Sequence, residues 1–521
     1  MRAIAVALTL AAAGHVAFAQ PGDPAPPGDG SAAGSGSADA QPLEQPPPPS
    51  PSSPAAAPPP VTPVRAEPPP TAPPATQDLW RDPDKGFRFG SYGRVIAGGD
   101  LRGGKPVSAN IVGRGPRIVE PSYLELDFSY GLVTKRGLKV RPVLTLAFKG
   151  TLFHDTGQFD AQPALRNMFL DAQVTRHLTA WAGSRMYRGD DIYLFDYWPL
   201  DDLNTVGGGL YFRKAEGADG RGDAIELAGH AGVNRLLTPF QFQEIDVPNP
   251  EQGATTVVQL NRQRMVASAT GAYLLAGEPE GLSLKAKLHA ELHTLPSGTR
   301  KRTDGTFEQL PSDTGFLVGG QVSAFGLSRK SNHRNHLNAY VRYAKGLAAF
   351  DELAPPTSFG SDLKTNRASE LTFGLSGNYD HALGNVMLGA LSRRFVDADG
   401  DSVDHDDGWE YAFAARPLAH VGRDFFAGAE LSYQARFPRG LNPTTQRAED
   451  PAVFQIAPML VYSPMGPSGY DRPQLRLVYR AAHRNQAALD EYVPDDPRHR
   501  HAWIHFLGIQ AEWWFNSSTY R

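Results

Sequence analysis

The chain has 521 residues, a formal net charge of −4 and no cysteine. The absence of cysteine excludes disulfide bonds and thiolate chemistry, and the nearly balanced charge argues against a nucleic-acid partner. Aromatic residues and glycine are abundant, whereas the long amphipathic helical patterns of a large soluble protein are hard to find.

The N-terminal residues have the pattern of an exported protein. In residues 1–19, Arg2 provides the positive end, an apolar run follows, and Ala17-Phe18-Ala19 forms a small-x-small cleavage site, which predicts a signal peptide. Residues 20–76 are rich in Pro, Ala, Ser and Gly and are expected to form a disordered periplasmic spacer. A passive linker is the simpler interpretation of this spacer, and binding to peptidoglycan is the alternative.

Residues 77–521 contain many segments in which apolar and polar residues alternate. One face of the segment 123–130 carries Leu124, Leu126, Phe128 and Tyr130, and the other carries Tyr123, Glu125, Asp127 and Ser129. A soluble β-sandwich would turn the apolar face inward, whereas a membrane barrel turns it toward lipid and lines water with the polar face. Several strands carry charge on one face, which favours a wet lumen; examples are Arg94, Arg342, Arg476 and Arg480. We therefore predict an all-β fold, a transmembrane antiparallel β-barrel of about 18 strands in the bacterial outer membrane.

The segment Gly183–Trp198 packs aromatic rings, arginines and carboxylates between two strand-like segments. Aromatic faces bind the apolar faces of sugar rings, and charged groups bind hydroxyls, so this run could line a path for sugars. Taken alone, it could equally be an ordinary polar loop.

The last strand-like segment, 503–515, places its aromatic residues on both faces. Trp503, Trp513 and Phe515 share the apolar face and are expected to belong to the girdle at the membrane interface. Trp514 has the opposite parity, beside Gln510 and Glu512, which points it into the lumen. A surface that stacks against sugar rings would explain an aromatic residue at that position.

Five motifs occur in the order in which the maltoporin family has them. They are Phe89-Gly90-Ser91-Tyr92-Gly93-Arg94, Tyr123-Leu124-Glu125-Leu126, Pro163-Ala164-Leu165-Arg166, Trp181-Ala182-Gly183-Ser184-Arg185 and Gly508-Ile509-Gln510-Ala511-Glu512-Trp513-Trp514. The chain thus resembles these sugar-specific outer-membrane porins from its first strand to its last. The resemblance implies a homotrimer surrounded by lipid and lipopolysaccharide, passive diffusion of maltodextrin-type oligosaccharides, an inward-folded constriction loop, and no cofactor.

In the maltoporin family a row of aromatic side chains, the greasy slide, guides glucosyl rings, and ionic groups bind their hydroxyls. By position, the resemblance implies slide residues at Tyr92, Tyr123 and Trp514, with Phe159 lent to a neighbouring subunit through an inward-dipping loop. It implies a polar track at Arg94, Arg117, Glu125 and Arg166. In the constriction loop it implies two carboxylates and two aromatic residues, namely Asp191, Asp196, Tyr197 and Trp198.

Three features depart from the family pattern. Gly189 and Tyr193 stand where the family has arginine and histidine, so the sugar preference of this channel is expected to differ. Glu410 falls where a late slide aromatic belongs, and Trp409 could replace it only if the strand carries a bulge. Residues 516–521 continue the chain beyond the girdle residue Phe515, where the family's terminal assembly signal usually ends.

Other functions remain as alternatives or are disfavoured. The lumenal arginines motivate a general or anion-preferring porin, and the spacer motivates an envelope anchor that binds peptidoglycan. Asp191 and Asp196 could be imagined as a glycosidase pair, but no nucleophile elbow, phosphate loop or His-Glu-x-x-His motif occurs, so no enzyme is predicted. No metal site is predicted either, because the acidic run Asp397, Asp399, Asp401 and Asp404 lacks the glycine and glutamate positions of a calcium loop, and His333, His336 and His499–His501 fit solvated loops.

Overall fold

The computed structural model describes residues 86–135, 137–149, 153, 162–216, 222–251, 253–277, 281–327, 335–351, 353–399 and 404–516. The predicted signal peptide and spacer lie outside these residues, as do Phe159, His333 and Asp401. Within the described ranges, no helix combines the length and the apolar character needed to cross a membrane.

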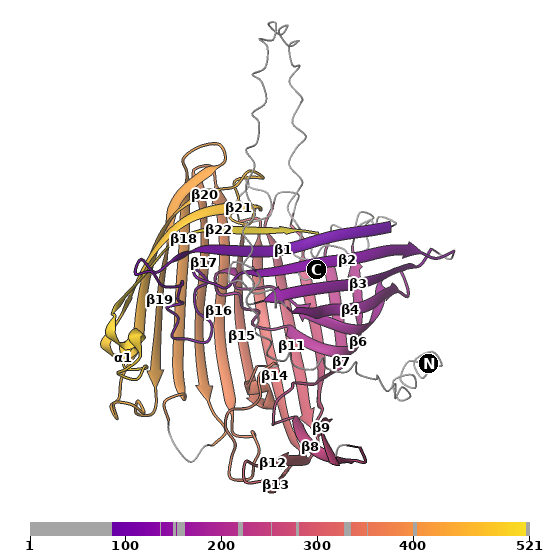
Figure 1. The fold of residues 1–521 in the computed structure, drawn as a ribbon. Coiled ribbons are helices and arrows are strands. Elements are labelled where there is room, and N and C mark those ends of the chain that lie inside the picture. Colours follow the sequence, from indigo (N-terminus) through magenta and orange to yellow (C-terminus); the bar gives the residue numbers. More distant parts are fainter. Residues whose placement is uncertain are drawn as a thin grey trace, which may run out of the picture. The chain divides into compact units, whose positions relative to one another are not determined.

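One closed antiparallel sheet of 18 strands forms the body of the described chain (Figure 1). Neighbours along the sequence pair with one another, and β1 closes the ring by pairing with β22, where Tyr92 lies opposite Trp514 and Arg94 opposite Glu512. The predicted antiparallel barrel is therefore confirmed. Its strands are β1 (Gly86–Gly99), β2 (Tyr123–Val133), β3 (Lys139–Lys149), β4 (Pro163–Gln173), β5 (Leu178–Arg188), β6 (Asp202–Ala215), β7 (Ala224–Asn234), β10 (Arg264–Leu275), β11 (Ser283–Leu295), β14 (Asp313–Phe325), β15 (His336–Gly346), β16 (Ser369–His381), β17 (Gly384–Val396), β18 (Gly408–His420), β19 (Phe425–Pro438), β20 (Ala452–Tyr462), β21 (Gln474–Arg484) and β22 (Trp503–Phe515).

Strand β11 shows why these sequences form a barrel rather than a soluble sandwich. Its outward face is apolar, and Leu288 leaves 73% of its surface exposed. Its inward face is polar and buried, and it consists of Lys285, Lys287, His289, Glu291 and His293. An exposed apolar face and a polar interior are stable only when lipid surrounds the sheet and the interior is wet or ion-paired.

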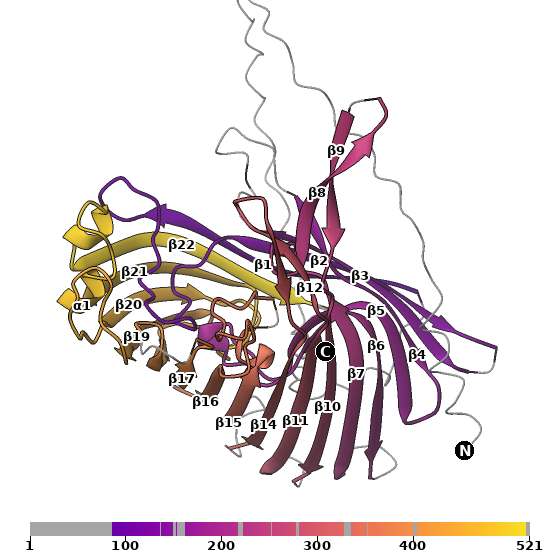
Figure 2. The same cartoon turned by 90° about the horizontal axis from the view of Figure 1, so that it is seen from below.

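The two ends of the barrel differ. Connections at the end that holds Gly86 and Phe515 are mostly short and define the short-turn end; the opposite connections define the long-loop end. The long loops contain two small ribbons, β8 (Phe242–Asn249) with β9 (Gly253–Leu260) and β12 (Gly298–Lys301) with β13 (Phe307–Leu310). Figure 2 shows β8 and β9 standing away from the barrel strands. The loops also hold the short helices η2 (Tyr193–Phe195), η3 (Leu347–Ala349), α1 (Gln486–Leu489) and η4 (Pro497–Arg500).

Two long loops fold into the lumen. The constriction loop, Gly189–Asp201, packs Ile192, Leu194 and Phe195 against side chains of β15, β17 and β18, including Tyr340 and Leu391. The first loop, residues 100–122, lays an apolar stretch that includes Ile118 over the inner wall from β18 to β22. The inward-folded loop predicted from the sequence is therefore present, and a second loop accompanies it.

Candidate functional site

The base of the constriction loop is held by charge pairs on strand β11. Lys287 Nζ donates to both carboxylate oxygens of Asp201, at 2.7 and 2.9 Å, and Lys285 pairs with Asp190. The Gly189 N–H donates to the Asp201 carbonyl at 3.0 Å, so the two stems of the loop touch. A Cβ atom on Gly189 would lie 2.0 Å from Asp201 Oδ1, so a side chain at this position would displace the Asp201 carboxylate.

The tip of the loop is a small hairpin. Ile192 and Tyr197 form an isolated antiparallel bridge, and Asp196 turns the chain with φ +52°, in the left-handed region that aspartate tolerates better than most residues. The Arg117 N–H donates to the Leu194 carbonyl at 3.1 Å and thereby joins the tip to the first loop. Asp196 is therefore needed for the turn as well as for its charge.

A cavity of about 530 Å³ lies between the constriction loop and one side of the barrel wall. Its wall comes from β1, β2, β4, β5, β6, β11, β14 and β15, together with the constriction loop, the first loop and residues between 348 and 354 of the loop that follows β15. Of the predicted site residues, the described part of the chain places these at its surface: Tyr92, Arg94, Tyr123, Glu125, Arg166, Asp196, Tyr197 and Trp198. Arg117, Asp191 and Trp514 lie outside that surface, and Phe159 is not among the described residues.

Arg166 enters the lumen because of a β-bulge. The pairing of β3 with β4 shifts between Thr145 and Leu146, so Arg166 has no partner of its own in that register. As a result Arg166 and Asn167 both point inward, while Leu165 on one side and Met168 on the other are exposed to the outside. Strict alternation would have turned one of the two polar residues toward lipid.

A guanidinium group lies over the rings of two candidate slide residues, Tyr123 and Trp514, and over those of Tyr197 and Trp198 in the constriction loop. Arg188 lies 3.6 Å from the centre of the Trp198 ring, and Arg472 lies 4.1 Å from that of Trp514. Tyr197 is covered by Arg114, and Tyr123 by Arg94 and Arg166. Such cation–π contacts are worth roughly 0.5–2 kcal/mol each, which is small enough for a bound ring to replace them.

The arginines around the cavity are paired with carboxylates. Arg114 pairs with Asp351, Arg188 with Asp202, Arg166 with Glu125, and Arg342 with Glu370. Arg94 lies 3.5 Å from both Glu120 and Asp196. The cavity surface therefore carries many charges of both signs and is nearly neutral in total. Arg114 and Asp351 had no marker in the sequence beyond their charge, because loop folding brings them to the cavity, whereas Arg188 ends β5 and Asp202 begins β6.

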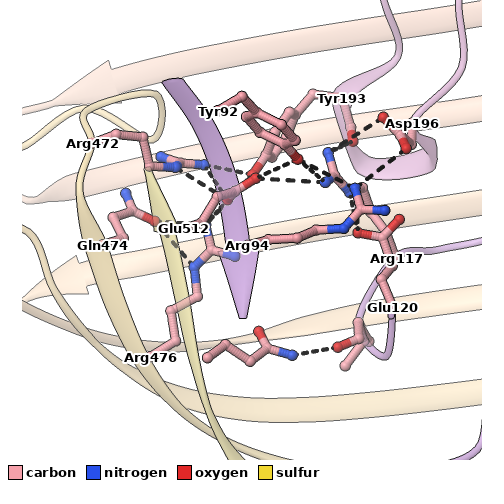
Figure 3. A network of polar contacts seen from close by, with 12 residues as sticks. Tyr92, Arg94, Arg117, Glu120, Tyr193, Asp196, Arg472, Gln474, Arg476 and Glu512 are labelled. Atoms are coloured by element: carbon pink, nitrogen blue, oxygen red, sulfur yellow. Dashed lines mark hydrogen bonds and ion pairs between the residues drawn. The ribbon is translucent and has the colours of Figure 1, made fainter. Parts of the chain in front are cut away.

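A buried polar network joins the constriction loop to the place where β1 pairs with β22 (Figure 3). The Tyr193 hydroxyl donates to Glu512 at 2.6 Å and accepts from Arg472 at 2.5 Å. The same carboxylate pairs with Arg476 at 2.6 Å and, through its other oxygen, with Arg117 at 3.5 Å. Arg472 and its neighbour Tyr470 were missed by the sequence reasoning, and the length of their turn is the only local signal that could have suggested them.

The structure also shows where Trp409, the acidic loop and His336 lie. The register between β18 and β19 shows no bulge at Trp409, which stacks on outward-facing Tyr411, while Glu410 pairs with Arg393 and Arg436. Trp409 therefore does not line the pore.

In the acidic loop, carboxylate oxygens of Asp397, Asp404 and Asp406 lie within 4.8 Å of one another. His336 begins β15, and its ring lies beside Phe325 and Tyr470.

Asp191 and Asp196, the two constriction-loop carboxylates predicted from the resemblance, have opposite pKa shifts. Burial and the nearby Asp196 charge raise the pKa of Asp191 to about 7. Burial alone would also raise the pKa of Asp196, but the charges of Arg117 and Arg94 lower it below its usual range. Asp196 is thus an ionised hydrogen-bond acceptor, whereas Asp191 exchanges its proton near neutral pH.

The raised pKa of Asp191 predicts that docking of the constriction loop in the lumen depends on pH. Because docking of the loop raises the pKa of Asp191, the docked loop favours the protonated carboxyl. The stability of the docked loop therefore falls as pH rises from about 4 to about 7. We expect open-channel current noise to be greater at pH 8 than at pH 5 in planar bilayers. Asp191→Asn should remove the difference, and a variant that keeps the full pH dependence would contradict this assignment.

Comparison with known proteins gives one family and several solved structures. The family model described as LamB porin matches residues 87–515. The outer-membrane channel DcaP of Acinetobacter baumannii is 11% identical, with 82% of this chain and 96% of that chain covered and a TM-score of 0.37. The anion-selective porin of Comamonas acidovorans is 13% identical, with 82% and 99% covered and a TM-score of 0.35. Wzi of Escherichia coli, a carbohydrate-binding β-barrel, is 9% identical, with 81% and 83% covered and a TM-score of 0.36. The comparison with curated sequences found no match.

Proposed function

Because the chain belongs to the LamB porin family and is therefore a channel of the bacterial outer membrane, we propose that it carries sugars, of the maltodextrin type, by passive diffusion. The observation that carries the proposal is the cavity, in which Tyr92, Tyr123, Tyr197 and Trp198 share one surface with paired arginines and carboxylates. We further propose that it works as a homotrimer embedded in lipid and lipopolysaccharide. The family and the fold indicate a channel rather than an enzyme.

The proposed mechanism is an exchange of partners on the aromatic rings. A sugar ring that stacks on Trp198 takes the place of the Arg188 guanidinium, and the freed guanidinium then donates to the sugar hydroxyls. Each bound state replaces contacts that the empty channel already has, so the net affinity is low. Low affinity at successive sites is what rapid conduction requires.

The charge balance favours a neutral solute over an anion. Each arginine at the cavity surface has a carboxylate partner, so an anion would gain little attraction and would meet acidic side chains such as Asp202 and Asp351. The general or anion-preferring porin is the second candidate, and the number of arginines at the cavity surface, among them Arg94, Arg114 and Arg188, motivates it. Reversal potentials with strong anion selectivity and no sugar block would support that candidate.

Block of ion current by maltodextrins in planar bilayers tests the proposal. Maltodextrins are expected to interrupt the current of the purified channel, and Trp198→Ala should weaken the apparent affinity about two- to tenfold, as the loss of one stacking surface predicts. Trp503→Ala, on the outward face of β22, is the control and should leave the block unchanged. A wild-type channel that no maltodextrin blocks would rule out the sugar-specific function.

We propose separately that the spacer at residues 20–76 has a structural role. Its Pro-rich composition suits an extended tether that could bind peptidoglycan. Deletion of residues 20–76 should then abolish peptidoglycan pull-down and leave conductance intact. Retained pull-down would show that the segment is only a linker.

A further inference from the structure

The connection between β20 and β21 is unlike the others at the short-turn end. This segment, Ser463–Pro473, which we call the crossing segment, is the longest turn at that end. It reaches past β18 and β19, since Ser468 Oγ donates to Asp380 at the end of β16 at 2.6 Å. The Asn385 amide at the start of β17 donates to the Pro467 carbonyl at 3.1 Å. The segment therefore spans the inner side of several strands instead of joining two neighbours.

The crossing segment and the constriction loop meet inside the barrel, although they enter from opposite ends. The Tyr470 ring packs edge-on against the Tyr193 ring, with centroids 5.4 Å apart. Arg472 donates to the Tyr193 hydroxyl at 2.5 Å and to Glu512 at 3.1 Å. Figure 3 shows Arg472 beside Tyr193 and Glu512. Its side chain is fully buried and also covers the Trp514 ring. Tyr193 is thus the point at which the two segments join.

The cavity lies entirely on the other side of this junction. Among the described residues, its lining comes from β1, β2, β4 to β6, β11, β14, β15 and the loops, and no residue of β16 to β22 contributes. The inner wall of β16 to β22 is instead covered by the constriction loop, the first loop and the crossing segment. This arrangement also explains why Trp514, which has lumenal parity, lies outside the cavity surface.

We propose that the junction of Tyr193 with Arg472 and Tyr470 determines the size limit of the channel. The crossing segment closes the part of the lumen next to β16–β22 and confines solutes to the remaining passage. Tyr193 and Arg472 act as specificity-determining residues without touching the solute, because they hold the two closing segments together. The inference rests on channel function alone and not on the identity of the solute.

Removal of the crossing segment tests the proposal. Replacement of residues 464–472 by Asn-Gly should raise single-channel conductance in KCl about twofold and admit larger neutral polyethylene glycols. The reason is that the conductance of a channel rises with the cross-sectional area of its lumen. Shortening the β8–β9 ribbon, which stands away from the barrel, is the matched control and should change neither quantity. A shortened variant that inserts as a heat-modifiable barrel with unchanged conductance and size limit would overturn the proposal.

Point substitutions keep the proposal testable if the shortened barrel does not assemble. Tyr193→Phe removes the buried hydrogen bond and keeps the ring, and Arg472→Gln removes it together with the charge and shortens the side chain. Both should raise conductance and the size of the largest polyethylene glycol that enters. Ser468→Ala, which loses the bond to Asp380, should have a smaller effect in the same direction. If Arg472→Gln and Tyr193→Phe both conduct like the wild type, the junction does not set the size limit. KCl conductance needs no sugar, so this outcome is independent of the maltodextrin test.

Discussion

Glu512→Ala is expected to destabilise the folded barrel by about 3–5 kcal/mol, the usual cost of removing one partner from a buried ionic group. The Glu512 carboxylate lies within 3.5 Å of Arg117, Arg472 and Arg476 and accepts the Tyr193 hydroxyl. Without it, Arg472 and Arg476 would lose their carboxylate partner, whereas Arg117 would keep Glu120 at 2.8 Å. The constriction loop should undock, and conductance should become larger and noisier. Heat-modifiable gel mobility gives the stability, and bilayer recordings give the conductance.

The matched control for Glu512 is Glu308 in the β12–β13 ribbon. Its carboxylate also binds two arginines, Arg300 and Arg302, both at 2.6 Å, but Arg302 is more than half exposed. Exposed ion pairs contribute about 0–1 kcal/mol, so Glu308→Ala should leave the melting temperature and the conductance nearly unchanged. Equal effects of the two substitutions would show that burial of the network is not what makes Glu512 important.

Gly189→Arg, which restores the residue that the maltoporin resemblance would place there, is expected to disrupt the base of the constriction loop. Any Cβ at position 189 meets Asp201 Oδ1 at 2.0 Å, so the carboxylate must move away from Lys287. A buried lysine would then lose its partner, at a cost of about 3–5 kcal/mol. The loop should become sensitive to protease added to the purified barrel, and sugar block, where present, should weaken with it.

Gly189→Ala and Gly229→Ala separate this collision from the general effect of replacing a glycine. Gly189→Ala keeps the clash with Asp201 but adds no charge, so it should reproduce most of the loop exposure. A Cβ on Gly229 in β7 would have no neighbour within 4 Å, and that variant should behave like the wild type. If Gly189→Ala leaves the loop protected, the new arginine and not the contact between the stems would be the cause of any disruption.

Side-chain parity made much of the fold predictable. In a strand, the face of each residue follows from its position alone, so the inward direction of Trp514 and Glu512 and the outward direction of Trp503 and Phe515 could be predicted from alternation. Alternation failed at Arg166, because a bulge is an interruption of the pattern and depends on the pairing with β3. The strand number was predictable from length, since each strand and its connection use a similar number of residues.

The candidate site was less predictable than the barrel. Position along the constriction loop placed Asp196, Tyr197 and Trp198 at the cavity, but it also suggested Asp191, whose carboxyl the docked loop buries elsewhere. Lumenal parity for Trp514 was read correctly, yet nothing in β22 reveals that Arg472 covers its ring. Such contacts depend on how loops from opposite ends meet, and local sequence patterns carry no information about that meeting.

The closure of β1 on β22 has a consequence for the order of folding. Tyr92 and Glu512, which the network joins, are separated by 420 positions, and Tyr193 and Arg472 by 279. Contacts of such separation are slow to form, because nearly the whole chain must be positioned before they become favourable. Arg472 and Arg476 can pair with Glu512 only once the last strand has arrived beside them and the first strand. The network is therefore a late product of assembly, and fluorescence of Trp514 under Arg472 would report the moment at which the barrel is complete.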